Sequence, residues 1–79
     1  MDMVGEPKVI LPHRRIIGAA IRRFRKEAKF SQETLAEQVN LNPKYIGEVE
    51  RGEKIISIEA LMRIATTLKM PVVAFFEGL

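Results

Sequence analysis

Residues 42–54 carry side chains whose types and spacing suit hydrogen bonding to nucleic-acid bases. Lys44 and Glu48 are four residues apart, so in an α-helix both side chains would lie on the same face. A lysine there could donate to O6 and N7 of guanine, and a glutamate could accept from N4 of cytosine. The alternative is that the two side chains pair with each other, which stabilises a helix by only about 0.3 kcal/mol. The first interpretation predicts a surface that recognises bases, and the second predicts only a slightly more stable helix.

Two short helices joined by a tight turn are predicted to position these side chains. Ser31 can cap the first helix, and apolar residues among 35–39 give that helix one buried face. Asn40 readily adopts the left-handed conformation that ends a helix. Asn42 can then cap a second helix, and Pro43 suits its first position because proline has no amide hydrogen to leave unpaired.

The second helix is predicted to run from Pro43 to about Arg51 and to end at Gly52. At about 100° per residue it has an apolar inner stripe and a polar outer face. The residues on the predicted outer face are Lys44, Gly47, Glu48 and Arg51. The DNA major groove admits one α-helix, so a short angled helix with long polar side chains is suited to enter it. We therefore predict that this is a recognition helix for double-stranded DNA.

Further residues of this region could contact a DNA backbone. Gln32 could bind a phosphate together with the free amides at the start of the first helix, and Arg51 and Lys54 add positive charge beyond the second helix. Gly47 would let the backbone approach a base pair closely, and glycine otherwise weakens a helix by about 0.5–1 kcal/mol. The predicted DNA-binding residues are Gln32, Asn42, Pro43, Lys44, Tyr45, Gly47, Glu48, Arg51 and Lys54.

The same stretch resembles the helix-turn-helix of phage-repressor-like regulators, the XRE family. The residues that carry the resemblance are Gln32, Leu35-Ala36, Asn40, Ile46, Val49 and Glu50-Arg51-Gly52. Asn40 stands where the family usually has glycine. The resemblance extends from about Ile16 to Phe76. It implies an all-α fold, a compact five-helix DNA-binding domain with the helix-turn-helix at helices 2 and 3, and a role as a transcriptional regulator.

Within that family, residues 45–52 and the closing Phe75-Phe76 resemble the small controller proteins of restriction–modification systems. Such controllers are single-domain dimers, and they often carry a base-reading arginine just before the residue that matches Lys44. This chain has Pro43 at that place. The resemblance therefore allows a controller role without implying the usual controller operator.

The first third of the chain is predicted to hold a basic helix that starts near His13. Apolar residues recur there at helical spacing, giving a core stripe of Ile17, Ala20, Ile21, Phe24 and Ala28. Residues 1–29 contain eight Lys or Arg against three acids, whereas residues 30–79 contain five against seven. If the protein binds DNA, much of the attraction for phosphates must therefore come from the first third of the chain; the alternative is that these charges only keep a helix hydrated.

One arginine of this helix has a different expected role. The resemblance implies that Arg25 pairs with Glu50 and so ties the first helix to the recognition helix. Removing one partner of such a buried pair typically costs about 3–5 kcal/mol. Arg25 is therefore expected to position the recognition helix and not to contact bases.

Two units are expected along the chain: an N-terminal arm over residues 1–12 and the helix-turn-helix domain over residues 13–79. The arm contains two prolines and a glycine around the apolar residues 9–11, too interrupted for an element of its own. Lys8 is its only cation, so an arm that follows DNA and an arm held by its apolar residues are both open interpretations.

The C-terminal part is predicted to add a fourth helix and a last short one. Ser57 can cap the fourth helix, whose core face is expected to contain Ile58, Leu61, Ile64 or Ala65, and Leu68, with Met62 adding breadth. Pro71 can open the last helix, which runs through Phe76.

A homodimer is predicted from the end of the chain. Phe75 and Phe76 are adjacent, about 100° apart on a helix, and cannot both enter the same core; the alternative is that both rings pack against helices one and four. The predicted dimer interface is Val72, Phe75, Phe76 and Leu79. A two-fold dimer would place two recognition helices about 34 Å apart, one turn of DNA.

Composition limits the other possibilities. A chain of 79 residues without cysteine is expected to form one small domain with no disulfide or thiolate metal site. The longest apolar run is Met70 to Phe76, far short of the ~20 residues that span a bilayer, and the N-terminus lacks a secretion signal. We expect a cytoplasmic protein. No nucleophile–base pair, phosphate loop or metal-ligand spacing is present, so we expect no enzyme activity, no cofactor and no small-molecule effector.

Two functions remain to be compared. The first is a homodimeric, sequence-specific DNA-binding transcriptional regulator. The second is a protein-interaction module, such as an antitoxin or a docking subunit, which the acidic balance of residues 30–79 and the aromatic C-terminus favour. The first predicts a functional Lys44 side chain, and the second predicts functional aromatic rings at the C-terminus.

Overall fold

The computed structural model describes residues 11–79 of the chain, which form helices and no strand. The helices are α1 (Pro12–Glu27), α2 (Gln32–Val39), α3 (Pro43–Glu50), α4 (Ile58–Leu68) and the 3-10 helix η1 (Val72–Phe76). The predicted all-α fold is confirmed, but the expected fifth α-helix is wrong. Residues 72–76 make a 3-10 turn, the form that short terminal helices often take.

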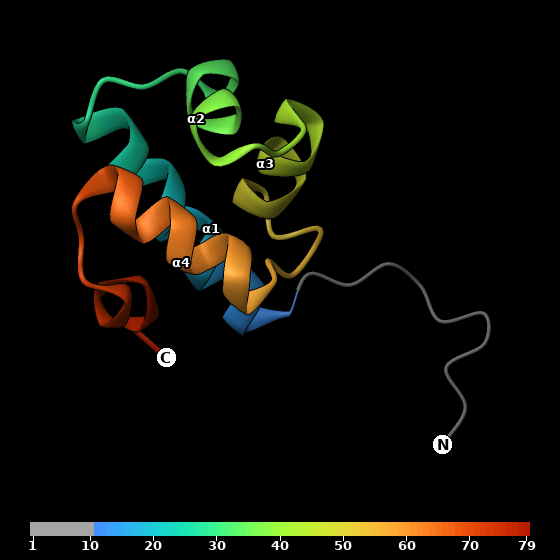
Figure 1. The fold of residues 1–79 in the computed structure, drawn as a ribbon. Coiled ribbons are helices and arrows are strands. Elements are labelled where there is room, and N and C mark those ends of the chain that lie inside the picture. The colour runs from blue at the N-terminus through green and yellow to red at the C-terminus, as the bar shows by residue number, and fades with distance from the viewer. Residues whose placement is uncertain (1–10) are drawn as a thin grey trace.

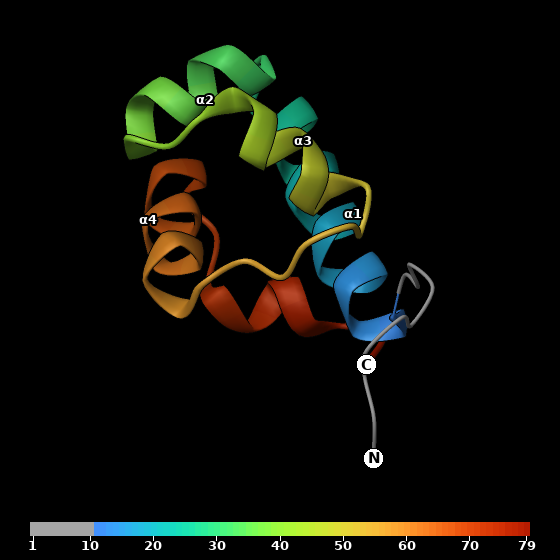
Figure 2. The ribbon, with the colours of Figure 1, turned by 90° about the vertical axis from the view of Figure 1, so that its right-hand side faces the viewer.

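The helices surround a single core. α1 and α4 lie beside each other in the body of the molecule, α2 and α3 lie over one end, and η1 closes the other end (Figures 1 and 2). α3 packs on α1 and α2, while η1 packs on α1 and α4. α2 and α3 therefore stand together at one end of the molecule.

Each of the five elements contributes a large residue to the centre of the core. These fully buried residues are Ile21, Leu35, Ile46, Ile64 and Phe75. Burying such a side chain contributes about 1.5–3 kcal/mol. The ring of Phe75 also meets that of Phe24 edge to face, with centroids 5.0 Å apart. The short η1 helix is thereby fixed to α1.

The predicted caps are present at three helix starts. Ser31 accepts a hydrogen bond from the Thr34 amide at 2.9 Å, and Ser57 accepts one from the Ala60 amide at 3.1 Å. At the start of α3, the Asn42 carboxamide oxygen accepts from the amide of residue 44 at 2.8 Å. Each cap is typically worth about 1 kcal/mol. These local contacts set where α2, α3 and α4 begin.

The turn between α2 and α3 has the conformation that the sequence predicted. Asn40 is left-handed, with φ 60° and ψ 49°, and the Leu41 amide donates to the Ala36 carbonyl at 2.8 Å. Asparagine thus performs the role that glycine usually has at this place. Gly52, at the end of α3, also has a positive φ, 79°. Both α2 and α3 are therefore followed by a residue that tolerates this backbone.

Some predicted core positions are wrong. Ala28 is exposed because α1 ends at Glu27 and residue 28 already belongs to the turn. Ile58 and Met62 are 73% and 51% exposed, because the buried side of α4 is made by residues 60, 61, 64, 65 and 68. Apart from Leu11 and Pro12, the arm predicted for residues 1–12 lies outside the described residues.

A close crossing of α1 and α3 has no counterpart in the sequence analysis. A Cβ atom added to Gly18 would lie 2.1 Å from the carbonyl oxygen of Val49 and 3.0 Å from that of Glu50. No side chain fits between the two backbones there. Gly18 therefore sets how closely α3 approaches α1.

Replacing this glycine should separate the two helices. We expect Gly18→Ala to lower the free energy of unfolding by about 1–3 kcal/mol, although alanine is the better helix former, and urea denaturation measures the change. The matched control is Ala19→Gly, at the exposed neighbouring position, which should cost only about 0.5–1 kcal/mol. A Gly18→Ala variant as stable as the unaltered protein would contradict the close crossing.

Candidate nucleic-acid interface

A buried ion pair ties α3 to α1. Arg25 donates from Nε to Oε2 of Glu50 at 2.6 Å and from NH2 to Oε1 at 2.9 Å, and the two side chains are 7% and 1% exposed. The NH1 group donates to the Phe30 carbonyl at 2.8 Å, in the turn before α2. The predicted Arg25–Glu50 pair is confirmed. One guanidinium group thus fixes α1, the following turn and the end of α3.

Gln32 extends this network to α2. Its Nε2 donates to Oε1 of Glu50 at 3.0 Å, so the first residue of α2 is bonded to the last residue of α3. Sequence reasoning assigned Gln32 to phosphate binding alone and missed this contact. The two residues are 18 positions apart, and no local pattern reports such a pairing.

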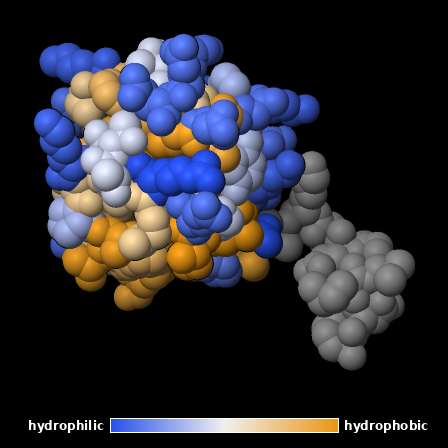
Figure 3. All heavy atoms as spheres, in the orientation of Figure 1, coloured by the Kyte–Doolittle hydropathy of each residue, from blue (hydrophilic) through white to orange (hydrophobic). Residues whose placement is uncertain are grey.

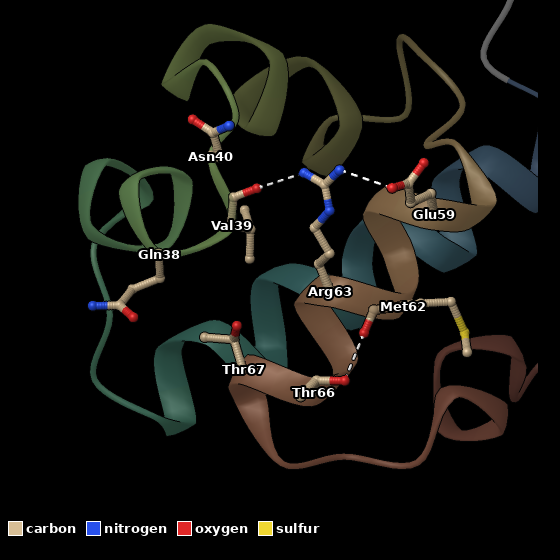
Figure 4. Close-up of a pocket in the computed structure, with 8 residues that line it drawn as sticks. All are labelled: Gln38, Val39, Asn40, Glu59, Met62, Arg63, Thr66 and Thr67. Atoms are coloured by element: carbon tan, nitrogen blue, oxygen red, sulfur yellow. Dashed lines mark hydrogen bonds and ion pairs between the residues drawn. The ribbon is translucent and has the colours of Figure 1, made fainter.

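Arg63 provides a second fixing point for α2, and the sequence analysis gave it no role. Its NH1 donates to the Val39 carbonyl at the end of α2 at 3.0 Å, and its NH2 donates to Glu59 at 3.0 Å (Figure 4). The guanidinium crosses an open groove between α2 and α4. Only the Glu59–Arg63 spacing of four residues was readable from the sequence. α2 is therefore held at its start by Glu50 and at its end by α4.

The outer side of α3 presents Lys44, whose side chain is exposed. Glu48 pairs with Lys54, with Oε1 and Nζ 3.3 Å apart, so the alternative of a Lys44–Glu48 pair is not what forms. Within residues 11–79, the Lys44 side chain makes no ion pair and is exposed. Its ammonium group is available to an external acceptor.

Five of the predicted DNA-binding residues come together around one shallow pocket at α3. They are Asn42, Lys44, Tyr45, Glu48 and Lys54. Two of them also have internal bonds: the Asn42 carboxamide caps α3, while the Tyr45 hydroxyl donates to the Ile55 carbonyl at 3.2 Å and accepts from the Ser57 amide at 3.3 Å. Tyr45 therefore holds the loop that carries Lys54 against α3.

Gly47 requires a correction, because it is buried and does not face outward. A Cβ atom added there would lie 3.1 Å from NH1 of Arg51 and 3.5 Å from Oε1 of Gln32, so these two side chains cover it. Arg51 also bonds Glu53, from Nε at 2.9 Å and from NH2 at 3.3 Å. The hydrogen bond and the charge of Glu53 raise the pKa of Arg51 above its ordinary value.

The residues predicted for a dimer interface are divided by the structure. Phe75 is fully buried, so its assignment to a surface is wrong; its ring fills the core against α1. Val72 and Phe76 are half-buried, and Leu79 is 64% exposed. Val73, which the sequence analysis left out, is 67% exposed. Only one of the two adjacent rings enters the core, as their angular separation predicted.

The outward face of α1 carries the positive charge that the sequence predicted. The exposed cations on this helix are Arg15, Arg22, Arg23 and Lys26. No helix within residues 11–79 is long and apolar enough to cross a membrane. In that same part of the chain, no group of three or more His, Cys, Asp or Glu residues could hold a metal ion.

Comparison with known proteins agrees with this geometry. A family model, HTH_3, described as helix-turn-helix, matches residues 21–75, which include α2, the turn and α3. The chain belongs to the helix-turn-helix family. The resemblance to XRE-type regulators is thereby confirmed, and the α2–α3 unit is its helix-turn-helix.

Several solved helix-turn-helix proteins share the fold. The restriction–modification controller C.AhdI from Aeromonas hydrophila has a TM-score of 0.76 and 33% identity, over 80% of this chain and 96% of the controller. The clp gene regulator ClgR from Corynebacterium glutamicum has a TM-score of 0.77 and 33% identity, over 87% of this chain and 71% of ClgR. SinR, a master regulator for biofilm formation solved in complex with DNA, has a TM-score of 0.73 and 29% identity, over 77% of this chain and 98% of that one.

A curated relative matches part of the chain. The HTH-type transcriptional regulator RamB from Mycobacterium tuberculosis is 31% identical over 48 residues. These residues make up 61% of this chain and 10% of the length of RamB.

Breaking the buried pair should show how much the helix-turn-helix depends on it. We expect Arg25→Met to lower the free energy of unfolding by about 3–5 kcal/mol, because Glu50 would remain charged and buried with only Gln32 as a donor. Chemical denaturation measures the change. The control is Glu59→Gln in the exposed Arg63–Glu59 pair, which should cost less than about 1 kcal/mol. Equal losses of unfolding free energy in the two variants would show that burial does not determine how much the Arg25–Glu50 pair contributes to stability.

Proposed function

We propose that this chain is a cytoplasmic, sequence-specific DNA-binding transcriptional regulator that acts as a homodimer, with α3 entering the major groove. The observation that carries the proposal is the division of α3 into two sides. Its inner side is fixed by Glu50 to Arg25 and Gln32, while its outer side presents Lys44, which forms no ion pair with any residue of 11–79. A rigid helix with an unpaired cation on its open side suits contact with base edges.

Different residues of this surface would serve different contacts. Lys44 is placed to donate to guanine, and Glu48, held by Lys54, to accept from cytosine. Gln32, Arg51 and Lys54 would contact phosphates and set the orientation of α3. The exposed cations of α1 would add attraction for the duplex that does not depend on sequence.

An exposed apolar surface supports the homodimer. Large apolar side chains gather on the lower part of the face in Figure 3, the region of α4 and η1 in Figure 1. The strongly exposed residues of these elements and of the C-terminus are Ile58, Met62, Val73 and Leu79. Contiguous apolar surface on a small domain commonly marks association, and a two-fold arrangement would present two copies of α3 to one duplex. We propose this surface, with the half-buried Val72 and Phe76, as the contact between protomers.

The similarity to C.AhdI and to the controller C.Esp1396I, which is 31% identical with a TM-score of 0.75, supports a small regulator of the controller type. Selection of bound duplexes from a random DNA pool tests the proposal directly. A two-fold-symmetric consensus is expected. Recovery of no preferred sequence would reject sequence-specific regulation and favour the protein-interaction alternative.

Lys44 is the residue whose removal should most clearly alter sequence preference. We expect Lys44→Ala to weaken binding to the selected duplex by about 1–3 kcal/mol and to relax the preference at one position of each half-site. Fluorescence anisotropy with the selected duplex and single-base variants measures both effects. The control Lys26→Ala, on the outer face of α1, should weaken binding equally for every sequence. Unchanged preference in Lys44→Ala would exclude base contact by this side chain.

The dimer surface can be tested without touching the helix-turn-helix. We expect Met62→Lys combined with Val73→Lys to give a monomer, because two charges would be buried at the interface without partners. Sedimentation measures the mass. The control is Glu37→Lys on the exposed side of α2, which should remain dimeric. If both variants keep the mass of the unaltered protein, α4 and η1 do not form the interface.

A further inference from the structure

Two lysines flank the carboxylate of Glu48, and only one of them holds it. Lys44 is four residues before Glu48 on α3, the spacing at which oppositely charged side chains of a helix commonly pair. The pair that forms is instead with Lys54, from the loop after α3, with Nζ and Oε1 3.3 Å apart. All three side chains line the same shallow pocket, but Lys44 has no ion-pair partner among residues 11–79.

The backbone on both sides of Lys54 is tied to α3. On one side, the Glu53 amide donates to the Glu48 carbonyl at 2.9 Å. On the other side, the Tyr45 hydroxyl donates to the Ile55 carbonyl at 3.2 Å. The loop therefore has little freedom at residue 54, and it brings the lysine to the Glu48 carboxylate at a fixed place.

The competition between the two lysines favours the one in the loop. A lysine that precedes a glutamate by four residues is the weaker of the two possible orders on a helix, so Lys44 is a poor competitor. The Glu48 side chain is only 17% exposed, so salt and water screen its pair with Lys54 less than they would screen a fully exposed pair. Lys54 thus compensates the charge of Glu48, and the ammonium group of Lys44 stays available.

We propose that Lys54 is a positioning residue for base recognition: it holds the Glu48 carboxylate and so keeps Lys44 free to bind a base. The inference rests on the proposed function, and it gives Lys54 an effect on sequence preference in addition to the proposed phosphate contact. A lysine ammonium has three N–H donors, so Lys54 can bind Glu48 and a phosphate oxygen together. Without Lys54, the unpaired carboxylate of Glu48 would compete with the base for Lys44.

A phosphate contact by Lys54 alone would have a different effect on binding. Phosphates are the same in every sequence, so losing one contact weakens binding equally for all duplexes. The proposed role predicts a loss that depends on the base pair that Lys44 contacts. Glu48→Gln separates the two effects, because it removes the competing charge at nearly constant size and leaves every phosphate in place.

The test is the preference for the base that Lys44 contacts, at the position that Lys44→Ala identifies. Fluorescence anisotropy with the selected duplex and its variants at that base pair measures this preference. We expect Lys54→Gln to lower it about two- to fivefold, the effect of a partly exposed ion pair, and Lys54→Arg to keep it. Adding Glu48→Gln to Lys54→Gln should restore the preference, because a neutral amide does not compete for Lys44. The control Lys26→Gln, on the outer face of α1, should weaken binding equally for every sequence.

Two results would overturn the positioning role of Lys54. One is a loss in Lys54→Gln that is equal at every base pair, which would leave Lys54 as a phosphate contact only. The other is a double variant that does not regain the preference. If Lys44→Ala leaves the preference unchanged, this inference fails while the regulator can stand. If the unaltered protein selects no sequence at all, the proposed function fails, and this inference fails with it.

Discussion

The buried pair of Arg25 and Glu50 is the interaction on which the rest of the structure depends. Removing two charges from water carries a large penalty, and only good geometry with further hydrogen bonds offsets it. Here the carboxylate of Glu50 accepts three hydrogen bonds, two from Arg25 and one from Gln32, and the remaining end of Arg25 is used by the Phe30 carbonyl. Few other arrangements of α1, α2 and α3 would satisfy all these groups, so the pair specifies their mutual orientation.

The close crossing at Gly18 and the ion pair act on the same contact between α1 and α3. Gly18 lets the α3 backbone come so close to α1 that no methyl group would fit between them. Arg25, two turns further along α1, forms the ion pair with Glu50. Ile46 and Val49 complete the buried side of α3. The inner side is therefore fully occupied, and Lys44 and Glu48 lie on the outward side of this short helix. The contacts of α3 with α1 therefore both fix the inner side of α3 and leave Lys44 exposed on its outer side.

What the sequence predicted well was local. The caps at Ser31, Asn42 and Ser57 depend on side chains within three residues, and the turn at Asn40 on one backbone preference. Left-handed helix ends at Lys29 and Lys69 were missed, since lysine gives no such signal. Contacts between distant residues, such as Gly18 with Val49, were missed for a different reason: only the packed fold brings these groups together. Gly47 shows the limit of helical periodicity, which placed it on the outward face of α3, whereas the side chains of Arg51 and Gln32 cover it in the structure.

The paired acids also alter how the charge of the helix-turn-helix should be interpreted. Residues 30–79 are acidic by count, which favoured a protein partner over DNA. In the structure, however, Glu48, Glu50 and Glu53 are each within an ion pair, with Lys54, Arg25 and Arg51. The acids nearest α3 therefore have their charges compensated at short range, whereas the charge of Lys44 has no ion-pair partner among residues 11–79. Because the field that a duplex meets is set by charges that remain uncompensated near its surface, the acidic count gives little reason to exclude DNA from α3.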